Sequence, residues 1–412
     1  MAGRSLHRKA LIVLLAVVAC DYGQVSLVAP APRVGPLTLL VQADSEDAAP
    51  ARELGWSSGI PDAVVTLTAQ DSTIAPQTGR TDAGGRVNFP GVVAGGYVLE
   101  AHRWLSVAEL GQLAAREDVI GFAAVRGISH DGFAGTHAVL APASRQRSLV
   151  ISEWSFNYPT FGDYFFMGFL ELYNNADTTV YLDGMIVGET LPLSYDYPKF
   201  PCAAYETLTN DPDALWARRL DRFPGQGRDY PLAPGATTVI ATDAIDHRPF
   251  LPGALDLRDA NFDFAGPADV HNPTVPDMID VGLSPMFLGH GTFYGVLTSV
   301  VFVALPLNVT ALPRQRASVE GSEWAGVPRA SVLDVVALRS PFEAGYPRCP
   351  TVVHRNFDRL PADLIGLGDQ DFAFSANRKV AVTRTGGRKI LQHTRTARAD
   401  FYRRPRTPHI IP

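Results

Sequence analysis

Apolar and polar residues alternate in short segments of the N-terminal part of the chain, and this pattern constrains the fold more than any other feature. In the segment Ala63–Thr68, Val65 and Leu67 alternate with Thr66 and Thr68. A period of two indicates a β-strand with one buried face. Three more segments are predicted to be strands: Leu37–Val41, Arg86–Phe89 and Tyr97–Ala101.

Glycine-rich turns separate these segments. The pairs Gly84–Gly85 and Gly95–Gly96 supply the positive φ that tight hairpins need. The whole chain contains 36 Gly and 32 Pro among 412 residues, which predicts many turns and little helix. We therefore expect residues 37–147 to form an antiparallel β-sandwich.

One short helix is predicted to interrupt this sandwich. Ser106 and Glu109 have the spacing of a capping box, which marks the start of a helix. Val107, Leu110 and Leu113 fall on one face of that helix, and we expect this face to pack against the sheets rather than to bind a partner.

The second half of the chain predicts another β-sandwich, over residues 148–412, with longer strands and long loops. A second helix is expected over Asp211–Trp216, because Asp211 can cap it and Pro212 can take its first position. The sequence thus predicts an all-β chain of two sandwich domains. Its predicted strands are Leu149–Glu153, Met167–Asn175, Thr179–Gly184, Val239–Ala241, Ser299–Leu305 and Val332–Leu338.

The N-terminus has the pattern of a bacterial lipoprotein signal peptide over residues 1–19. A segment with three basic residues precedes the apolar run Leu11–Val18, and Val17–Cys20 fits the lipoprotein cleavage box. The alternatives are a transmembrane anchor or a secretory signal with a chance cysteine, but the run is about half of the ~20 residues that a spanning helix needs. We expect Cys20 to be the lipid-attachment site, followed by a linker over residues 20–36.

The charge balance excludes one class of partner. Without residues 1–19 the chain keeps 33 Lys and Arg against 42 Asp and Glu, a formal net charge of −9. Nucleic-acid binding draws on dense positive charge, so no nucleic-acid partner is expected. A local exception is the segment Arg378–Arg406, with ten basic residues and only Asp400 as an acid. It could contact lipid head groups, lipopolysaccharide or an acidic partner, or be a solvated charged strand.

Two cysteines remain besides Cys20, and both lie beside a proline in loop-like surroundings. In an oxidising compartment Cys202 and Cys349 are candidates for a disulfide that closes a loop of about 147 residues. The alternative is two unpaired thiols. Neither cysteine has the spacing of a zinc site or a redox pair.

Motifs in the N-terminal sandwich resemble the carboxypeptidase regulatory-like, or transthyretin-like, domain. They are Ile60–Val65, Thr81–Phe89, Gly91–Val92 and Gly95–Glu100. The quoted residues are turn and core residues, so the resemblance implies a fold. Domains of this type usually serve as non-catalytic spacers or presentation modules.

The C-terminal half resembles the lamin-tail (Ig-like) type of sandwich through Ile151–Glu153, Glu171–Asn174 and Leu182–Gly184. Over residues 148–408 it looks most like the family of unknown function 4876, bacterial lipoproteins in which this sandwich follows a carboxypeptidase regulatory-like domain. Further quoted stretches are Ala233–Gly235, Leu333–Val336, Ser375–Lys379 and Val270–Pro276. This resemblance implies a cell-envelope location near outer-membrane transport systems, and it implies no catalytic residue set.

Two groups of residues are candidates for chemistry. Asp and His side chains gather within about 50 residues and could hold a metal, although their spacing fits no known metal motif and loops are rich in these residue types. Glu153 and Glu171 fall on adjacent predicted strands, where a structural hydrogen bond or a calcium site is favoured over acid–base catalysis. The metal candidates are Asp243, Asp246, His247, Asp269, His271, Asp277 and His290.

A dense aromatic segment is the candidate binding patch, because exposed aromatic residues dominate binding hot spots. Half of this segment could instead belong to the core. The patch residues are Trp154, Phe156, Tyr158, Phe161 and Tyr164.

The sequence therefore predicts a non-enzymatic, lipid-anchored protein of the cell envelope, at the outer membrane or cell surface. We expect a binding or accessory role, with an outer-membrane β-barrel transporter or a surface glycan as partner and no cofactor or metal. One alternative is a metal-dependent hydrolase that uses the Asp and His loop around His247 and His271. Another is a structural lipoprotein whose partner is the cell wall.

Overall fold

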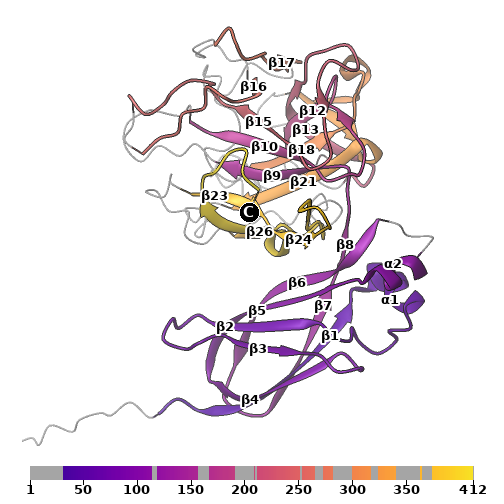
Figure 1. Ribbon diagram of the computed structural model, residues 1–412, viewed down its shortest axis with the longest axis vertical. Coiled ribbons are helices and arrows are strands. Elements are labelled where there is room, and N and C mark those ends of the chain that lie inside the picture. Colours follow the sequence, from indigo (N-terminus) through magenta and orange to yellow (C-terminus); the bar gives the residue numbers. More distant parts are fainter. Residues whose placement is uncertain are drawn as a thin grey trace, which may run out of the picture.

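A computed structural model of the protein contains two β-sandwiches that follow one another along the chain (Figure 1), as the sequence predicts. Among the described residues, no helix has both the length and the apolar character needed to cross a membrane. The structure describes residues 31–113, 118–155, 167–190, 208, 211–250, 253–264, 272–281, 299–316, 323–339, 362–363 and 374–411.

The N-terminal sandwich consists of two facing sheets. One has the strand order β4–β1–β7, with β1 antiparallel to β4 and parallel to β7, and the other has the order β3–β2–β5–β6–β8. The strands are β1 (Val34–Ala43), β2 (Val64–Ala69), β3 (Gln77–Arg80), β4 (Arg86–Val93), β5 (Gly95–Trp104), β6 (Val119–His130), β7 (Gly135–Ala141) and β8 (Ala143–Arg145).

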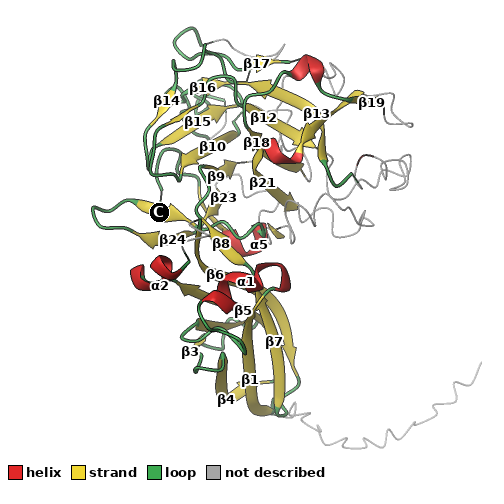
Figure 2. Ribbon diagram, turned by 90° about the vertical axis from the view of Figure 1, so that its right-hand side faces the viewer, coloured by secondary structure: helices red, strands yellow, loops and turns green. Residues whose placement is uncertain are grey.

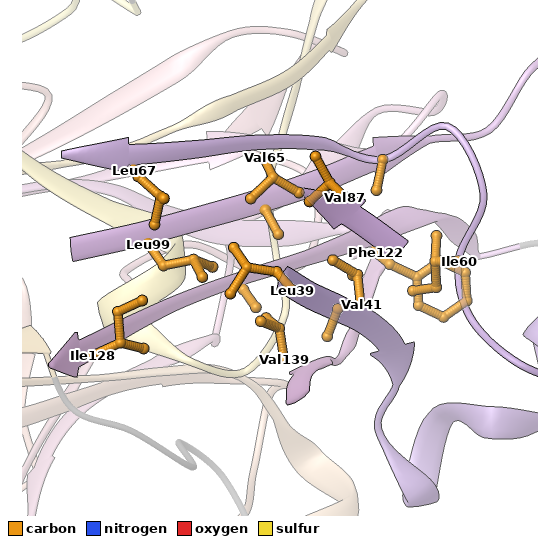
Figure 3. Close-up of a cluster of buried hydrophobic side chains, with 14 of the residues drawn as sticks. Leu39, Val41, Ile60, Val65, Leu67, Val87, Leu99, Phe122, Ile128 and Val139 are labelled. Carbon is orange, nitrogen blue, oxygen red and sulfur yellow. The ribbon is translucent and has the colours of Figure 1, made fainter. Parts of the chain in front are cut away.

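The core of this sandwich confirms the period-two prediction. Leu39 and Val41 point from β1 toward Val65 and Leu67 of β2 and Leu99 of β5 (Figure 3), and all five side chains are at most 1% exposed. Burying a side chain of this size contributes roughly 1.5–3 kcal/mol. Alternation in both sheets therefore creates one continuous apolar layer between them.

Three short helical segments flank this core: η1 (Ser45–Asp47), α1 (Ala48–Glu53) and α2 (Val107–Gln112). The capping box of α2 is confirmed, since Ser106 Oγ accepts from Glu109 N and Glu109 Oε2 accepts from Ser106 N. Leu113 is buried, but Val107 is 88% exposed, so its predicted packing role is wrong. At 3.6 residues per turn, a step of three residues turns by about 300°, so Val107, at the first position of the helix, does not point in the same direction as Leu113.

The C-terminal sandwich also has two facing sheets. The first has the order β16–β15–β10–β9–β23–β26. The second has the order β19–β20–β13–β12–β18–β21–β22, with β17 paired to β13. The first sheet comprises β9 (Leu149–Ser155), β10 (Phe169–Asn174), β15 (Thr237–Ala241), β16 (Phe262–Asp263), β23 (Phe374–Arg378) and β26 (Phe401–Pro405). The second comprises β12 (Ile186–Thr190), β13 (Ala214–Arg222), β17 (Ile279–Asp280), β18 (Ser299–Ala304), β19 (Arg314–Arg316), β20 (Glu323–Pro328), β21 (Val332–Arg339) and β22 (Ala362–Asp363).

Apolar residues from both sheets fill the space between them. Ile151 and Leu170 of the first sheet share a buried cluster with Val301, Val303 and Val336 of the second. Smaller elements complete this sandwich. They are β11 (Val180–Tyr181) with β14 (Pro231–Leu232), β24 (Val380–Thr383) with β25 (Lys389–Leu391), η3 (Val309–Ala311), η4 (Arg329–Ser331) and α5 (Ala397–Asp400). Of these, β24 and α5 lie on its side toward the N-terminal sandwich (Figure 2).

The predicted helix at Asp211–Trp216 is wrong, because this segment leads into strand β13. Asp211 does cap a turn: Oδ1 accepts from the backbone N of Asp213 and Ala214. Its Oδ2 accepts from Nε1 of Trp216, a contact that an extended chain allows. Local capping chemistry is therefore present, but pairing with β12 and β20 decides the strand conformation.

The two sandwiches contact each other through the hairpin β24–β25. Ile390 and Ala381 of the hairpin pack on Ile120 of β6, with Trp104 of β5 beside them. A backbone hydrogen bond also joins the two sandwiches: Arg145 N of β8 donates to the carbonyl oxygen of His393 at 2.9 Å. Residues near the C-terminal end of the chain thus hold the two sandwiches together.

Several basic side chains of the segment Arg378–Arg406 form ion pairs with acids elsewhere in the protein. Lys379 Nζ lies 3.3 Å from Glu100 Oε1 of the N-terminal sandwich. Arg384 and Arg388 both pair with Asp177. Many of these charges therefore serve internal contacts between distant parts of the chain.

Candidate functional site

Glu153 and Glu171 face each other across the antiparallel strands β9 and β10 and form a buried acidic site of the first C-terminal sheet. They are register partners, and their side chains are 1% and 0% exposed. A β-bulge next to this pair places Ser152 where its Oγ donates to Glu171 Oε1 at 2.7 Å. The strand register, as the sequence predicts, makes them a carboxylate pair on one face of the sheet.

The neighbouring strand and the C-terminal segment complete the environment of Glu153. Ser375 Oγ of β23 donates to Glu153 Oε1 at 2.5 Å, and the backbone N of Thr407 donates to the same oxygen at 3.0 Å. Asn377 Nδ2 donates in turn to Ser375 Oγ at 2.9 Å. Among the described residues, Glu153 Oε2 has no hydrogen-bond partner.

The C-terminal segment also covers Glu171. The backbone N of His409 donates to Glu171 Oε2 at 2.5 Å, and His409 has a φ of 66°, which is unusual for a residue other than glycine. Ile411 packs nearby against Tyr173, and its carbonyl oxygen accepts from Lys389 Nζ. Residues 406–411 therefore lie across the outer face of the sheet, directly over the two acids.

Burial raises the pKa of both acids, and repulsion from Glu153 raises that of Glu171 further. Burial raises the pKa of Glu171 to about 7; the hydrogen bond from Ser152 opposes this shift and the negative charge of Glu153 adds to it. Burial also raises the pKa of Glu153, against the hydrogen bond from Ser375. The Arg406 guanidinium is buried as well, which lowers its pKa to about 10 despite the attraction of Glu153. The pair is therefore suited to hold a proton near neutral pH in a site closed to water.

A second buried network lies where β21, β23 and α5 meet. Arg378 is 2% exposed, and its Nη2 contacts Asp334 Oδ2 at 2.6 Å, while Nη1 lies 3.4 Å from Asp400 Oδ2. Arg378 Nε donates to the carbonyl oxygen of Ile151, and His393 Nε2 lies 3.1 Å from Asp334 Oδ1. One arginine thus connects both sheets of the C-terminal sandwich.

The two acids of this network have opposite pKa shifts. Burial alone would raise the pKa of Asp334, but the Arg378 guanidinium and His393 hold it below its usual range. Burial raises the pKa of Asp400, because the more distant Arg378 contact does not fully offset it. The direction of each pKa shift thus follows the distance from Arg378, which is shorter for Asp334 than for Asp400.

The sequence-predicted metal cluster does not assemble among the described residues, where no group of three or more potential ligands comes together. The carboxylate of Asp246 binds Arg248, and that of Asp256 binds Arg248 and Arg258. His247 is buried, and its Nε2 lies 2.9 Å from the carbonyl oxygen of Asp243. Asp269, His271 and His290 lie outside the described residues.

The predicted binding patch is wrong for Trp154. This side chain is 1% exposed and belongs to the core cluster between the two sheets, because it points to the opposite face of β9 from Glu153. Phe156, Tyr158, Phe161 and Tyr164 lie outside the described residues. So do the predicted lipid-attachment residue and the candidate disulfide, Cys20, Cys202 and Cys349.

Sequence reasoning missed the network around Arg378. The available signal was Asp334, a single acid between Leu333 and Val335 in an otherwise apolar strand. Because a charge in such a position is buried only when it is paired, it predicts an arginine or lysine partner elsewhere in the chain. The sequence could not identify that partner, because Arg378 lies 44 residues away.

Fold and site define an all-β protein of two sandwiches, the second of which contains several buried ionisable side chains. Residues 233–408 match the family described as "Protein of unknown function (DUF4876)". A crystal structure of a DUF4876 family protein from Bacteroides thetaiotaomicron VPI-5482 aligns with 89% of this chain and 94% of that chain, at 18% sequence identity and a TM-score of 0.49. No curated protein matches the chain.

Proposed function

We propose that this protein is a non-enzymatic, lipid-anchored component of the bacterial cell envelope. In this proposal, a diacylglycerol on Cys20 attaches the chain to the membrane. The N-terminal sandwich is a carboxypeptidase regulatory-like spacer, and the lamin-tail-like C-terminal sandwich makes contact with a partner of the outer membrane or cell surface.

The observation that carries this proposal is the position at which the chain enters the N-terminal sandwich. The described chain begins, in indigo in Figure 1, at the end of this sandwich that is remote from the C-terminal sandwich. The carbonyl oxygen of Arg33 accepts from Ala94 N, next to the start of β5. The other end of β5, at Trp104, packs beside the β24–β25 hairpin.

The length of β5 gives the separation between these two ends. Its ten residues span about 30 Å at ~3.3 Å per residue. A chain anchored before Arg33 therefore has the N-terminal sandwich between its lipid and its C-terminal sandwich. This arrangement fits a spacer that presents a binding domain away from the bilayer.

The contact between the sandwiches supports the same role. Apolar packing of Ile390 on Ile120 and the Lys379–Glu100 ion pair both lie at the junction. A spacer that is packed against its neighbour fixes the direction in which the second domain faces. The proposed partner is an outer-membrane β-barrel transporter or a surface glycan.

Metabolic labelling with an alkynyl fatty acid tests the anchor in a bacterial host that expresses the full-length chain with a C-terminal tag. The wild type should take up the label and sediment with membranes, whereas Cys20→Ser should lose the label and the membrane association. Cys202→Ser is the matched control and should keep both. An unlabelled wild type, or a labelled Cys20→Ser variant, would contradict the proposed anchor.

Cross-linking followed by affinity purification from the same membranes tests the partner. Enrichment of an outer-membrane β-barrel with the wild type, and its loss with Cys20→Ser, is the expected result. If no envelope component co-purifies after cross-linking, the proposed accessory role is wrong.

A further inference from the structure

The end of the N-terminal sandwich where the chain enters carries exposed apolar side chains. Val34 at the start of β1 is 59% exposed, and Phe133 in the loop between β6 and β7 is 55% exposed. Arg33 and Ala134 beside them are exposed as well. We call these four residues the basal surface; contiguous exposed apolar groups, unlike singly scattered ones, are a feature of interaction sites.

The loop that carries Phe133 is held firmly against the start of β1. Asp131 Oδ1 accepts from Phe133 N at 3.0 Å, and Gly132 adopts a φ of 81°. A Cβ on Gly35 would lie 2.4 Å from the carbonyl oxygen of Gly132, so the two backbones are in direct contact. The Arg33 guanidinium lies 4.8 Å from the centre of the Phe133 ring. The exposed ring is therefore presented in a fixed position.

The charges at this end do not favour an anionic ligand. Arg33 is the basic residue of the basal surface, and two exposed acids, Asp71 and Asp131, lie at the same end of the sandwich. The backbone N of Gln70, next to Asp71, donates to the carbonyl oxygen of Gly96 at the start of β5. An interaction here depends on apolar contact rather than on attraction between opposite charges.

The basal surface also contains Arg33 and Val34, which lie close in sequence to Cys20. Thirteen residue steps separate Cys20 from Arg33, and they reach at most about 45 Å when fully extended. A short tether gives a millimolar effective concentration, so a weak contact is enough to keep the surface on its target. Aromatic and aliphatic side chains beside an arginine are the residues that settle at the lipid–water interface.

We propose that the basal surface rests on the lipid bilayer, with the Phe133 ring and the Val34 side chain inserted at the level of the head groups. This proposal extends the anchored spacer proposed above and rests on it. It assigns the N-terminal sandwich a second task, because a sandwich seated on the membrane fixes the angle of the C-terminal sandwich as well as its distance.

Tryptophan fluorescence on vesicles tests this contact. The mature chain from Asp21, with an N-terminal hexahistidine tag, is bound to phosphatidylcholine vesicles that contain a nickel-chelating lipid and brominated acyl chains. Phe133→Trp adds a reporter to the basal surface. Leu140→Trp is the matched control: Leu140 is 53% exposed and lies near the far end of β7, about 15–20 Å from the basal surface.

The added fluorescence of Phe133→Trp should fall by about half or more, since interfacial side chains enter ~5–10 Å into the bilayer, and that of Leu140→Trp should not change. Val34→Trp should behave as Phe133→Trp does. High salt should leave the quenching intact, because the contact is apolar. Equal quenching of Phe133→Trp and Leu140→Trp, or no quenching of either, would overturn the proposal.

The artificial tether keeps this result separate from the question of lipid attachment. The tagged chain reports on the basal surface whether or not a cell modifies Cys20. Loss of quenching therefore refutes the bilayer contact alone, whereas an unlabelled wild type in the fatty-acid experiment refutes the anchor. A protein bound at the basal surface instead of lipid would leave Phe133→Trp unquenched on these vesicles, which also overturns the proposal.

Discussion

The two sandwiches share an architecture but differ in what fills them. In the N-terminal sandwich the core is a continuous apolar cluster, and its few buried polar residues are Asp47, Thr81, His130 and Ser144. In the C-terminal sandwich, buried acids, arginine and histidine lie within or against the sheets. Apolar burial tolerates imprecise geometry, whereas a buried charge is stable only with its partner in place.

The two sandwiches also differ in how far apart their paired strands lie in the sequence. Paired strands of the N-terminal sandwich lie at most 98 residues apart, as Leu37 of β1 does from Gly135 of β7. The C-terminal sandwich pairs strands more than twice as far apart, since Trp154 of β9 is the register partner of Ala376 of β23, 222 residues later. Buried ion pairs such as Asp334–Arg378 can specify such distant pairings, because a wrong register would leave a charge without its partner.

Removal of the central arginine should have the largest effect. Arg378→Met leaves Asp334 and Asp400 buried without their cation, and the free energy of unfolding of the C-terminal sandwich should fall by about 3–5 kcal/mol. Chemical denaturation followed by Trp fluorescence measures the loss. Arg258→Met, which removes an exposed arginine paired with Asp256, should stay near wild type. Equal stability of the two variants would refute the distinction between the cores.

Truncation of a core leucine tests the N-terminal sandwich. Leu39→Ala removes a fully buried side chain and should cost about 2–5 kcal/mol, with the same loss at pH 5 and pH 8 because no ionisable group is involved. Leu40→Ala, on the partly exposed side of the same strand, should cost clearly less. Thermal unfolding at both pH values checks this. A pH-dependent loss for Leu39→Ala would contradict an apolar core.

The carboxylate pair should make the C-terminal sandwich sensitive to pH. The pKa of Glu171 is raised to about 7 in the folded protein from its usual value near 4.5, so the folded state binds this proton more tightly than the unfolded state. The resulting stabilisation is fully present below about pH 4.5 and is lost as the pH rises through 7. Glu153, whose pKa is also raised, acts in the same direction.

Glu171→Gln should therefore flatten this pH dependence. Between pH 5 and pH 8 the variant should lose about 1–3 kcal/mol less stability than the wild type, because its side chain does not ionise. Urea denaturation at a series of pH values measures the slope. Glu46→Gln, at an exposed acid, should leave the slope unchanged. An unchanged slope in Glu171→Gln would show that the pair does not hold a proton.

The smallest effect is expected at the junction. Lys379 and Glu100 are partly exposed, so a double-mutant cycle with Lys379→Ala and Glu100→Ala should give a coupling of about 0.2–1 kcal/mol that decreases in high salt. Calorimetry at two salt concentrations measures it. A coupling that salt does not change would show that this ion pair is shielded from solvent, as the buried ion pairs are, and would contradict the prediction.

Much of the fold could be predicted from the sequence because local patterns carry it. Alternation in Val64–Ala69 and the capping box at Ser106 were both sufficient, since each depends on neighbouring residues. The helix predicted at Asp211 was wrong because its capping signal competes with strand pairing to β12 and β20. Local chemistry cannot reveal a partner strand that lies elsewhere in the chain.

The candidate site was predictable only in part, for the same reason. Glu153 and Glu171 could be paired because each stands in a recognisable strand segment. Residues 406–411, which lie over the two acids, could not be predicted. They donate through the backbone N of Thr407 and His409, and every residue type except proline has such a donor. The sequence does not predict which aromatic residues are core, and for Trp154 the β-bulge at Ser152 decides: it reverses the alternation that places Leu149 and Ile151 in the core, so Trp154 points inward as well.

The pairing of β9 with β23 sets an order of events for a chain that is synthesised from its N-terminus. The N-terminal sandwich is complete once residue 145 has emerged, because its last strand, β8, ends there. Strand β9 follows immediately, but Ser375, which donates a hydrogen bond to the Glu153 carboxylate, is synthesised 222 residues later. The C-terminal sandwich can therefore be completed only after almost the whole chain has been synthesised, and a chain that ends early lacks strands of its second domain.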